Sequence, residues 1–159
     1  MIFRRMIWTI LVSMVPAVEV KGAIPFGIAL GLAPAVAYVS ALVGSTFVVC
    51  FLAFVTNWFY RFCKEKKIFV KFIGWMDKIA LNNHEKIKKL GPLAIFVYVA
   101  IPIPGTGTWT GSIIAGVLNI KPKLIILSVL CGNLVAGLIM TIVGTGAVNV
   151  LDNIVNLPF

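Results

Sequence analysis

The first break in the apolar chain reads Pro16-Ala17-Val18-Glu19-Val20-Lys21-Gly22-Ala23-Ile24-Pro25. A second break reads Pro102-Ile103-Pro104-Gly105-Thr106-Gly107-Thr108-Trp109-Thr110-Gly111, and a shift of 88 positions places Pro16 on Pro104. The same shift pairs four further residues: Pro34 with Pro122, Ser40 with Ser128, Leu42 with Leu130 and Gly44 with Gly132. Irregular backbone at membrane depth is tolerated only where it is buried in protein or lines a cavity, so a repeated break favours a transporter.

The composition is that of an integral membrane protein. Of the 159 residues, 60% are hydrophobic and 12% are charged, against about 25% charged in soluble domains. Residues 22–60, 90–120 and 124–151 contain no charge, and each run exceeds the roughly 20 residues that cross a bilayer as a helix. No small-residue cleavage site follows the first apolar stretch, so we do not expect a removable signal peptide.

We therefore predict an all-α integral membrane fold of two inverted repeats, forming a single membrane domain over residues 1–159. Each repeat contains a re-entrant helical hairpin and one transmembrane helix, and a basic amphipathic linker helix joins the repeats. Because each repeat crosses the membrane once, consecutive copies must be inverted. The repeats span 1–60 and 90–159, and the linker spans 61–89. The predicted helices are 7–15, 25–32 and 34–60 in repeat one, and 92–101, 112–118 and 122–148 in repeat two.

An alternative has residues 7–31 and 93–118 each crossing fully, which gives four spans. We favour re-entry, because Pro16 with Pro25, and Pro102 with Pro104, would each damage a continuous helix.

Charge predicts the orientation in the membrane. The linker 61–89 holds most of the lysines and arginines, so the positive-inside rule makes it cytoplasmic and leaves both termini outside, with Arg4 and Arg5 as exceptions. The net charge of +9 then marks a membrane face with its lipids, and we expect no nucleic-acid partner. Apolar residues at helical spacing within 68–80 predict a helix at the headgroups. We expect a cell membrane location, plasma or inner, and a homodimer, on size alone.

Glu19 is the most informative single residue. A charge near the membrane midplane costs about 2.5–3.5 kcal/mol or more, so such residues usually face a cavity and have a function. Glu19 is either a coupling carboxylate for protons or cations, or an ion-pair partner that fixes the hairpin through Lys21. Lys21 in turn either holds an anionic group, such as a phosphate, or only neutralises Glu19.

The second break carries no charge, but its glycines free the backbone and its threonines supply hydroxyls. Exposed N–H groups at a helix start there would attract an anion, and close packing against the first break is the competing interpretation. The candidate substrate and coupling residues are Pro16, Glu19, Lys21, Gly22 and Pro25 in the first break, Pro104, Gly105, Thr106, Gly107, Trp109, Thr110 and Gly111 in the second, and Asn133 in the last span.

An enzyme has little support in this sequence. The three cysteines lack metal-like spacing, the single histidine lies in the linker, and no catalytic triad or nucleotide motif occurs. We expect no catalytic residue, no metal and no cofactor.

The two breaks resemble the signature of the small multi-drug export protein family, Pro-x-x-Glu-Leu-Arg-Gly-Ala-Ile-Pro and Pro-x-Pro-Gly-Thr-Gly-x-x-Thr-Gly. Lys21 stands where that family usually has arginine, so a bidentate phosphate clamp is lost. The architecture is also similar to DedA and VTT-domain membrane proteins, whose facing hairpins are implicated in moving lipids.

These observations lead to three functional hypotheses. The first is a transporter or flippase that moves an amphipathic, anionic lipid-like substrate, such as a lipid phosphate, through a midplane site, with proton coupling through Glu19. The second is a proton-coupled exporter of cationic amphiphiles, which the family name implies. The third is an ion channel or a structural scaffold. Membrane lipids are expected partners in each case.

Overall fold

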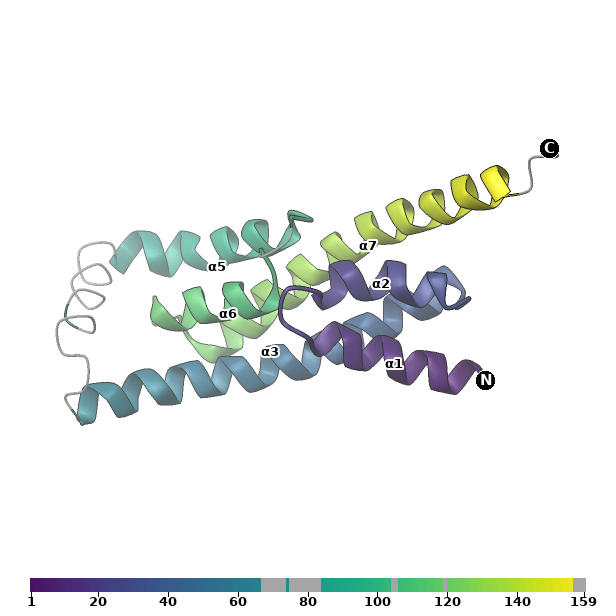
Figure 1. Ribbon diagram of the computed structural model, residues 1–159. Helices are drawn as coiled ribbons and strands as arrows, with labels where there is room; N and C mark the ends of the chain where they lie inside the picture. The colour runs from purple at the N-terminus through teal and green to yellow at the C-terminus, as the bar shows by residue number, and fades with distance from the viewer. Residues whose placement is uncertain (67–73, 75–83, 104–105, 119, 156–159) are drawn as a thin grey trace.

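The computed structural model describes residues 1–66, 74, 84–103, 106–118 and 120–155. The described chain is all helical, with six helices and no strand, as the sequence predicts (Figure 1). The predicted linker helix within 68–80 lies outside the described residues, apart from Gly74. In chain order the helices are α1 (Ile2–Met14), α2 (Glu19–Ala29), α3 (Pro34–Glu65), α5 (His84–Ala100), α6 (Thr108–Val117) and α7 (Pro122–Val155).

The turn between α1 and α2 is built by a proline and two left-handed residues. Pro16 disfavours helical backbone at the residue before it, and Val15 is extended, with φ −72° and ψ 130°. Ala17 and Glu19 then take positive φ angles of 71° and 51°. Side-chain-bearing residues hold this conformation at a cost of order 1–3 kcal/mol, so the turn concentrates backbone strain next to the charged residues.

The first two helices bring the chain back to the end from which it starts. The Arg5 guanidinium on α1 donates a hydrogen bond to the carbonyl of Gly31, just after α2, at 3.3 Å. Residues 5 and 31 therefore lie together, and residues 7–31 form two antiparallel helices instead of one continuous rod.

The predicted starts of all four short helices are wrong, and α1 begins at Ile2 instead of residue 7. The second helix begins at Glu19 and contains Pro25 in its interior, and α5 begins at His84 and contains Pro92. Helix α6 begins at Thr108, ahead of the predicted Ser112. An internal proline frees a carbonyl one turn earlier, but membrane helices tolerate this where neighbours re-satisfy the group. Consequently Glu19 to Gly22 is the first turn of a helix, and not the predicted loop.

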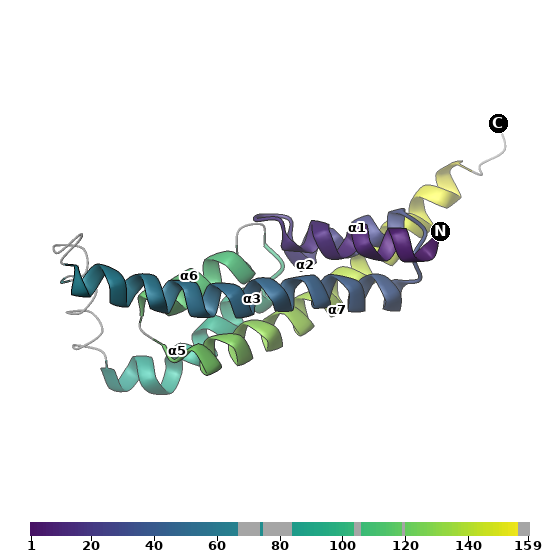
Figure 2. The same cartoon turned by 90° about the horizontal axis from the view of Figure 1, so that it is seen from below.

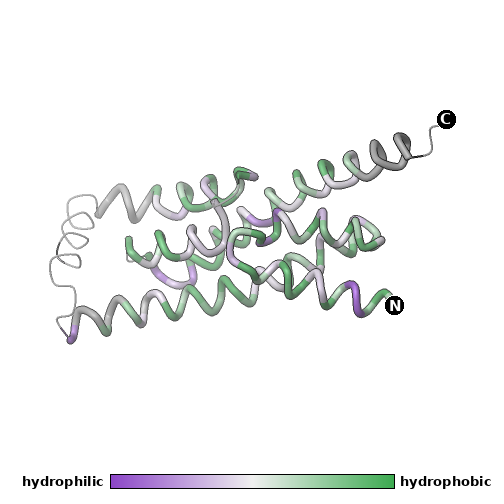
Figure 3. Tube along the Cα trace, viewed as in Figure 1, coloured by the Kyte–Doolittle hydropathy of each residue, from purple (hydrophilic) through white to green (hydrophobic). Residues whose placement is uncertain are grey.

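Two of the helices, α3 and α7, are long and apolar enough to cross a membrane, over Pro34–Thr56 and Pro122–Ala147. Both run further than predicted, to Glu65 and Val155. Hydrophobic residues dominate the described helices (Figure 3). The outward face of α3 carries large aromatic groups, since Phe47, Phe51 and Phe54 are 65%, 61% and 65% exposed. Such a face suits a lipid environment.

The helices of the two halves pair in the same way. Helix α1 packs on α3 as α5 packs on α7, while α2 also contacts α7 and α6 also contacts α3. Glycines matched by the 88-residue shift lie at the first two crossings. A Cβ on Gly44 would lie 2.0 Å from Ser13 Oγ on α1, and a Cβ on Gly132 would lie 2.7 Å from Val99 Cβ on α5. Both glycines therefore permit close helix approach.

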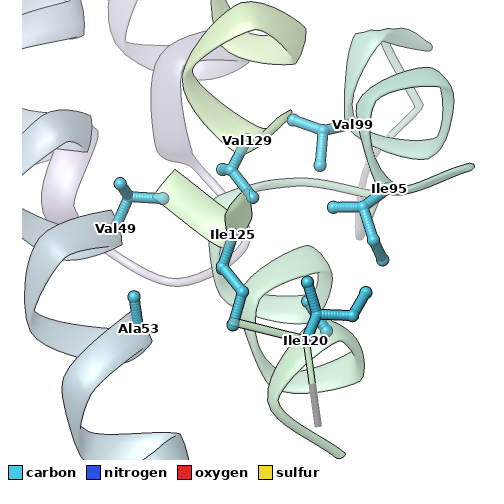
Figure 4. Packing of buried hydrophobic residues seen from close by; sticks show 8 residues of the cluster. Val49, Ala53, Ile95, Val99, Ile120, Ile125 and Val129 are labelled. Carbon is cyan, nitrogen blue, oxygen red and sulfur yellow. The ribbon is translucent and has the colours of Figure 1, made fainter. Parts of the chain in front are cut away.

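Two apolar clusters form the core, one in each half. The first joins α2 and α3 through residues such as Ile24, Ile28 and Ala37. The second joins α3, α5, α6 and α7, and Figure 4 shows Val49, Ile95, Val99, Ile120, Ile125 and Val129 packed together. Seen from below, the two short-helix pairs occupy opposite halves of the long helices (Figure 2). Their connecting turns meet between the two clusters.

Candidate functional site

The turn of the first helix pair (residues 15–18) and the turn of the second (residues 101–107) meet near the middle of the molecule (Figure 1). We call these the first and second tips, and we include in each tip the first turn of the helix that follows it. Glu19 and Lys21 belong to the first tip and are 5% and 9% exposed. Charges buried to this degree need partners, and both find them on the second tip.

The Glu19 carboxylate caps the N-terminus of α6. Its Oε2 accepts a hydrogen bond from the Thr108 amide at 3.0 Å, and its Oε1 accepts one from the Trp109 amide, also at 3.0 Å. The first N–H groups of a helix have no partner within the helix, and the helix dipole favours negative charge there. Glu19 therefore occupies an anion-binding position that the second tip provides.

Gly107 makes room for this carboxylate. A Cβ at this position would lie 1.3 Å from Glu19 Oε2 and 2.3 Å from Glu19 Cδ. The backbone of Gly107 is extended, with φ −139°, so other residues could adopt it. Space, and not conformation, is the reason for a glycine here.

The Lys21 ammonium lies in a group of four oxygen atoms, which we call the oxygen cage. It donates to the carbonyl of Ile101 at 2.8 Å, to the carbonyl of Ile103 at 3.2 Å and to Thr106 Oγ1 at 3.0 Å. The Thr106 carbonyl is the fourth acceptor. These oxygens follow the C-terminus of α5, where the helix dipole favours a cation.

The oxygen cage is held by bonds within the second tip itself. The Ile103 amide donates to the Ile101 carbonyl at 2.8 Å, and the Thr106 amide donates to the Ile103 carbonyl at 3.2 Å. Thr106 Oγ1 also lies 2.9 Å from each of these two carbonyl oxygens. The acceptors are therefore arranged by the loop, in addition to being bonded by Lys21.

Trp109 makes the converse contact from the second tip to the first. Its indole Nε1 donates to the Met14 carbonyl, at the end of α1, at 3.2 Å. The 88-residue shift matches Trp109 with Lys21, which donates to the carbonyls after α5. Lys21 of the first tip therefore donates to the end of α5, and Trp109 of the second tip donates to the end of α1.

A buried amide and hydroxyl extend the network into α7. Asn133 Nδ2 donates to Thr108 Oγ1 at 2.9 Å, and both residues are 1% exposed. Thr108 was not among the predicted site residues, although its amide and hydroxyl link Glu19 to Asn133. From the sequence a packing role is slightly favoured for Thr108, whereas packing and function are evenly balanced for Thr106 and Thr110, and only the fold shows that Thr108 links Glu19 to Asn133.

The remaining predicted residues serve the backbone or the packing. Thr110 Oγ1 accepts from the Gly107 amide at 3.1 Å and closes the start of α6. Gly111 packs against α5, since a Cβ there would lie 2.6 Å from Val99 Cγ2. Pro16 is exposed in the turn, and Gly22 packs against Val18 of its own turn. Pro25 lies inside α2, and Pro104 and Gly105 lie outside the described residues.

The two charges of the first tip do not pair with each other within the described residues. Each bonds to the second tip instead, so the structure does not show the Glu19–Lys21 ion pair that was the alternative to a functional role for Glu19. The described residues also contain no group of three or more His, Cys, Asp or Glu residues that could hold a metal ion. The site brings together two opposite charges, main-chain N–H donors and carbonyl acceptors.

A family model described as "Putative small multi-drug export protein" matches residues 19–139, which is more than half of the chain. The match includes the second tip and the part of the first tip that begins at Glu19. The chain therefore belongs to this family. Comparison with curated proteins and with solved structures gives no match.

Proposed function

Because the chain is a member of the small multi-drug export family, we propose that it is a membrane transporter of amphipathic molecules, with its substrate site where the two tips meet. One observation carries this proposal. The two buried charges of the first tip are held by main-chain groups and a hydroxyl of the second tip. A charged substrate head group can compete for these contacts, so binding and separation of the tips are linked.

The arrangement of the short helices supports re-entry. The Arg5–Gly31 contact brings the chain back to its starting end, which a full crossing over residues 7–31 would not do. The equivalent crossings at Gly44 and Gly132 support two repeats of one design. Two inverted repeats with half-helices that meet at the midplane are the usual framework for alternating access, in which one repeat rocks against the other.

Glu19 is the proposed coupling residue. As a carboxylate it satisfies two amides at the start of α6. Proton uptake removes its charge and one of its acceptor sites, which weakens the bonds to α6. Protonation of Glu19 would thus loosen one of the contacts between the tips and couple a proton to transport.

The site offers a position for each sign of substrate charge. The Thr108 and Trp109 amides already hold a carboxylate, which supports an anionic, lipid-like head group such as a phosphate. The oxygen cage already holds an ammonium, and this observation favours the second candidate, an exporter of cationic amphiphiles.

The membrane setting follows from the exposed surfaces. Residues on α3 and α7 expose apolar side chains to the surroundings, so lipids are the natural neighbours of the protein. Lys121 and Lys123 are exposed at the start of α7, and α7 begins in the half of the molecule that contains the end of α3 (Figure 1). This arrangement supports a cytoplasmic position for that end in a cell membrane, with both termini outside. A chain of this size has few helices with which to enclose a transport pathway, so we propose that it acts as a homodimer.

Reconstitution into liposomes tests the function directly. Movement of a fluorescent phospholipid, efflux of a cationic dye against a pH gradient, and ion current distinguish a flippase, a cation exporter and a channel. We expect the first or second readout, and current without either would contradict the proposal.

The Glu19→Gln variant tests the coupling role. We expect at least a tenfold loss of pH-dependent transport with folding retained, because glutamine keeps the shape but cannot exchange a proton. Glu65→Gln, at the exposed end of α3, is the matched control and should transport like the wild type. Unchanged transport in Glu19→Gln would remove this residue from the mechanism.

A further inference from the structure

We infer that the second tip is a receptor for a zwitterionic head group that carries a primary ammonium beside an anionic oxygen group. In this conformation the side chains of Glu19 and Lys21 occupy the receptor in place of that head group. This inference rests on the proposed transport function and narrows the substrate class.

The anionic half of the receptor is a built site. Two amides converge on one carboxylate, each at 3.0 Å. Gly107 leaves the space for this carboxylate, because any side chain at that position would overlap Glu19 Oε2. A phosphate or carboxylate of a ligand offers the same oxygen acceptors and would accept the same two N–H bonds.

The cationic half is the oxygen cage. Four acceptor oxygens from Ile101, Ile103 and Thr106 surround one nitrogen, and the resolved distances of 2.8–3.2 Å are those of N–H···O hydrogen bonds. An ammonium supplies three N–H donors to such acceptors, so the cage suits an ammonium group. The loop's own hydrogen bonds keep the cage formed when Lys21 withdraws.

The anionic and cationic halves of the receptor both lie on the second tip. The residues that fill them, Glu19 and Lys21, are two positions apart on the first tip. Glu19 and Lys21 belong to the same turn of α2, and together they add no net charge to the buried contact. A purely anionic or purely cationic ligand would displace one of them and leave the other charge without its counterpart, which is costly at low dielectric. A zwitterion replaces both and keeps the site neutral.

The chemistry of the cage also determines which kind of ammonium group a ligand must carry. Carbonyl and hydroxyl oxygens are acceptors, and Lys21 satisfies them with N–H donors. A primary ammonium brings three such donors, whereas a quaternary ammonium brings none. The receptor should therefore distinguish an ethanolamine head group from its trimethylated choline counterpart.

Binding is tested with the double variant Glu19→Ala/Lys21→Ala in lipid nanodiscs, with glycerophosphoethanolamine as the probe, because its phosphodiester carries a single negative charge and the molecule is neutral overall. We expect millimolar probe to raise the unfolding midpoint of this variant by about 3 °C or more, and to leave the wild type unchanged, because its own residues fill the receptor. Glycerophosphocholine and glycerophosphoglycerol, at equal ionic strength, are the controls. Equal shifts with all three probes, or no shift with glycerophosphoethanolamine, would overturn the inference.

Transport by the wild type gives a second test that needs no variant. We reconstitute the protein with acyl-labelled phospholipids that differ only in the head group, and we expect movement of the ethanolamine lipid at least tenfold faster than that of the choline or glycerol lipid. Equal rates for the three lipids would contradict the receptor while leaving the transport function intact. Stabilisation of the double variant with no transport of any amphiphile would keep the receptor and contradict the proposed function.

Discussion

Main-chain groups hold both charges at the contact between the tips. Glu19 bonds to two amides, and three of the four oxygens around Lys21 are carbonyls. Side-chain identity on the second tip therefore matters mainly where it leaves space or shapes the loop. Gly107 leaves space for the Glu19 carboxylate, and Thr106 shapes the loop through its hydroxyl group.

Gly107→Ala should destabilise the protein by about 1–3 kcal/mol, the usual cost of overpacking, because the new methyl group overlaps the Glu19 carboxylate. Thermal unfolding in nanodiscs measures the change. Gly146→Ala is the matched control, since no atom lies within 4 Å of a Cβ there.

A double-mutant cycle sharpens this prediction. Adding Glu19→Ala to Gly107→Ala removes the overlapping group, so the two losses of stability should be strongly non-additive. Additive losses would mean that the carboxylate does not occupy the space beside Gly107.

Trp109→Phe should cost about 1 kcal/mol of stability, because it removes one hydrogen bond to the Met14 carbonyl and keeps an aromatic ring. Trp8→Phe, on the 53% exposed Trp8 of α1, should cost much less. The two variants are compared by the same unfolding measurement, and equal effects would speak against the indole bond.

Glu19 and Lys21 could be singled out from the sequence because a charge within an apolar run is costly. Their partners could not, because main-chain amides and carbonyls carry no sequence signal. The oxygen cage depends on the backbone positions of Ile101, Ile103 and Thr106, which are bonded to one another and to Lys21 of the first tip. From the sequence, Lys21 is the one partner that can be suggested for Glu19, and an ion pair between them therefore remains the alternative to a functional role.

The helix crossings are the next scale of organisation. At Gly44 a Cβ would lie 2.3 Å from the Ile10 carbonyl oxygen, and at Gly132 it would lie 3.0 Å from the Phe96 carbonyl oxygen. Backbone atoms cannot move aside as side chains do, so both positions restrict helix separation. The match between these positions was visible in the sequence as a shift of 88 residues.

Gly44→Ala should be more damaging than Gly132→Ala, because the nearest backbone atom is 0.7 Å closer at the first crossing. We expect losses of stability in the range of about 1–3 kcal/mol, with the larger value for Gly44→Ala. Unfolding midpoints of the two variants in nanodiscs provide the comparison, and the reverse order would contradict the geometry of the α1–α3 crossing.

The sequence predicts the number and type of the described helices better than it predicts the residues at which they begin and end. Pro16 predicts the break after α1 correctly, since Val15 is extended. Pro25 and Pro92 predict helix starts wrongly, because each lies within a helix. Proline limits the backbone before it and removes one donor, but burial against neighbouring helices can outweigh both effects.

At the scale of the molecule, the re-entrant arrangement and four full crossings place the ends of the helices differently. With re-entry, Glu65 at the end of α3 and Lys123 at the start of α7 lie on one side of the membrane, and Arg4 lies on the other. With four crossings, Glu65 would share a side with Arg4 and Lys123 would be opposite.

Single cysteines at these three positions separate the arrangements. In a background without Cys50, Cys63 and Cys131, we expect an impermeant thiol reagent applied to intact cells to label the Arg4→Cys variant alone. Labelling of Lys123→Cys alone would favour four crossings with a cytoplasmic linker, and labelling of Arg4→Cys and Glu65→Cys without Lys123→Cys would favour four crossings in the opposite orientation. Permeabilised cells, in which all three variants should react, serve as the control for reactivity.

The distance along the chain between Glu19 and its partners has a consequence for biosynthesis. The bond from Thr108 to Glu19 spans 89 residues, so at about 5–20 residues per second the ribosome needs roughly 4 to 18 seconds to deliver the partner. During that interval the newly inserted first half holds an acid and an amine that nothing yet satisfies. Nascent chains halted before residue 101 should therefore stay bound to the insertion machinery or be degraded, whereas chains that pass residue 109 should be released.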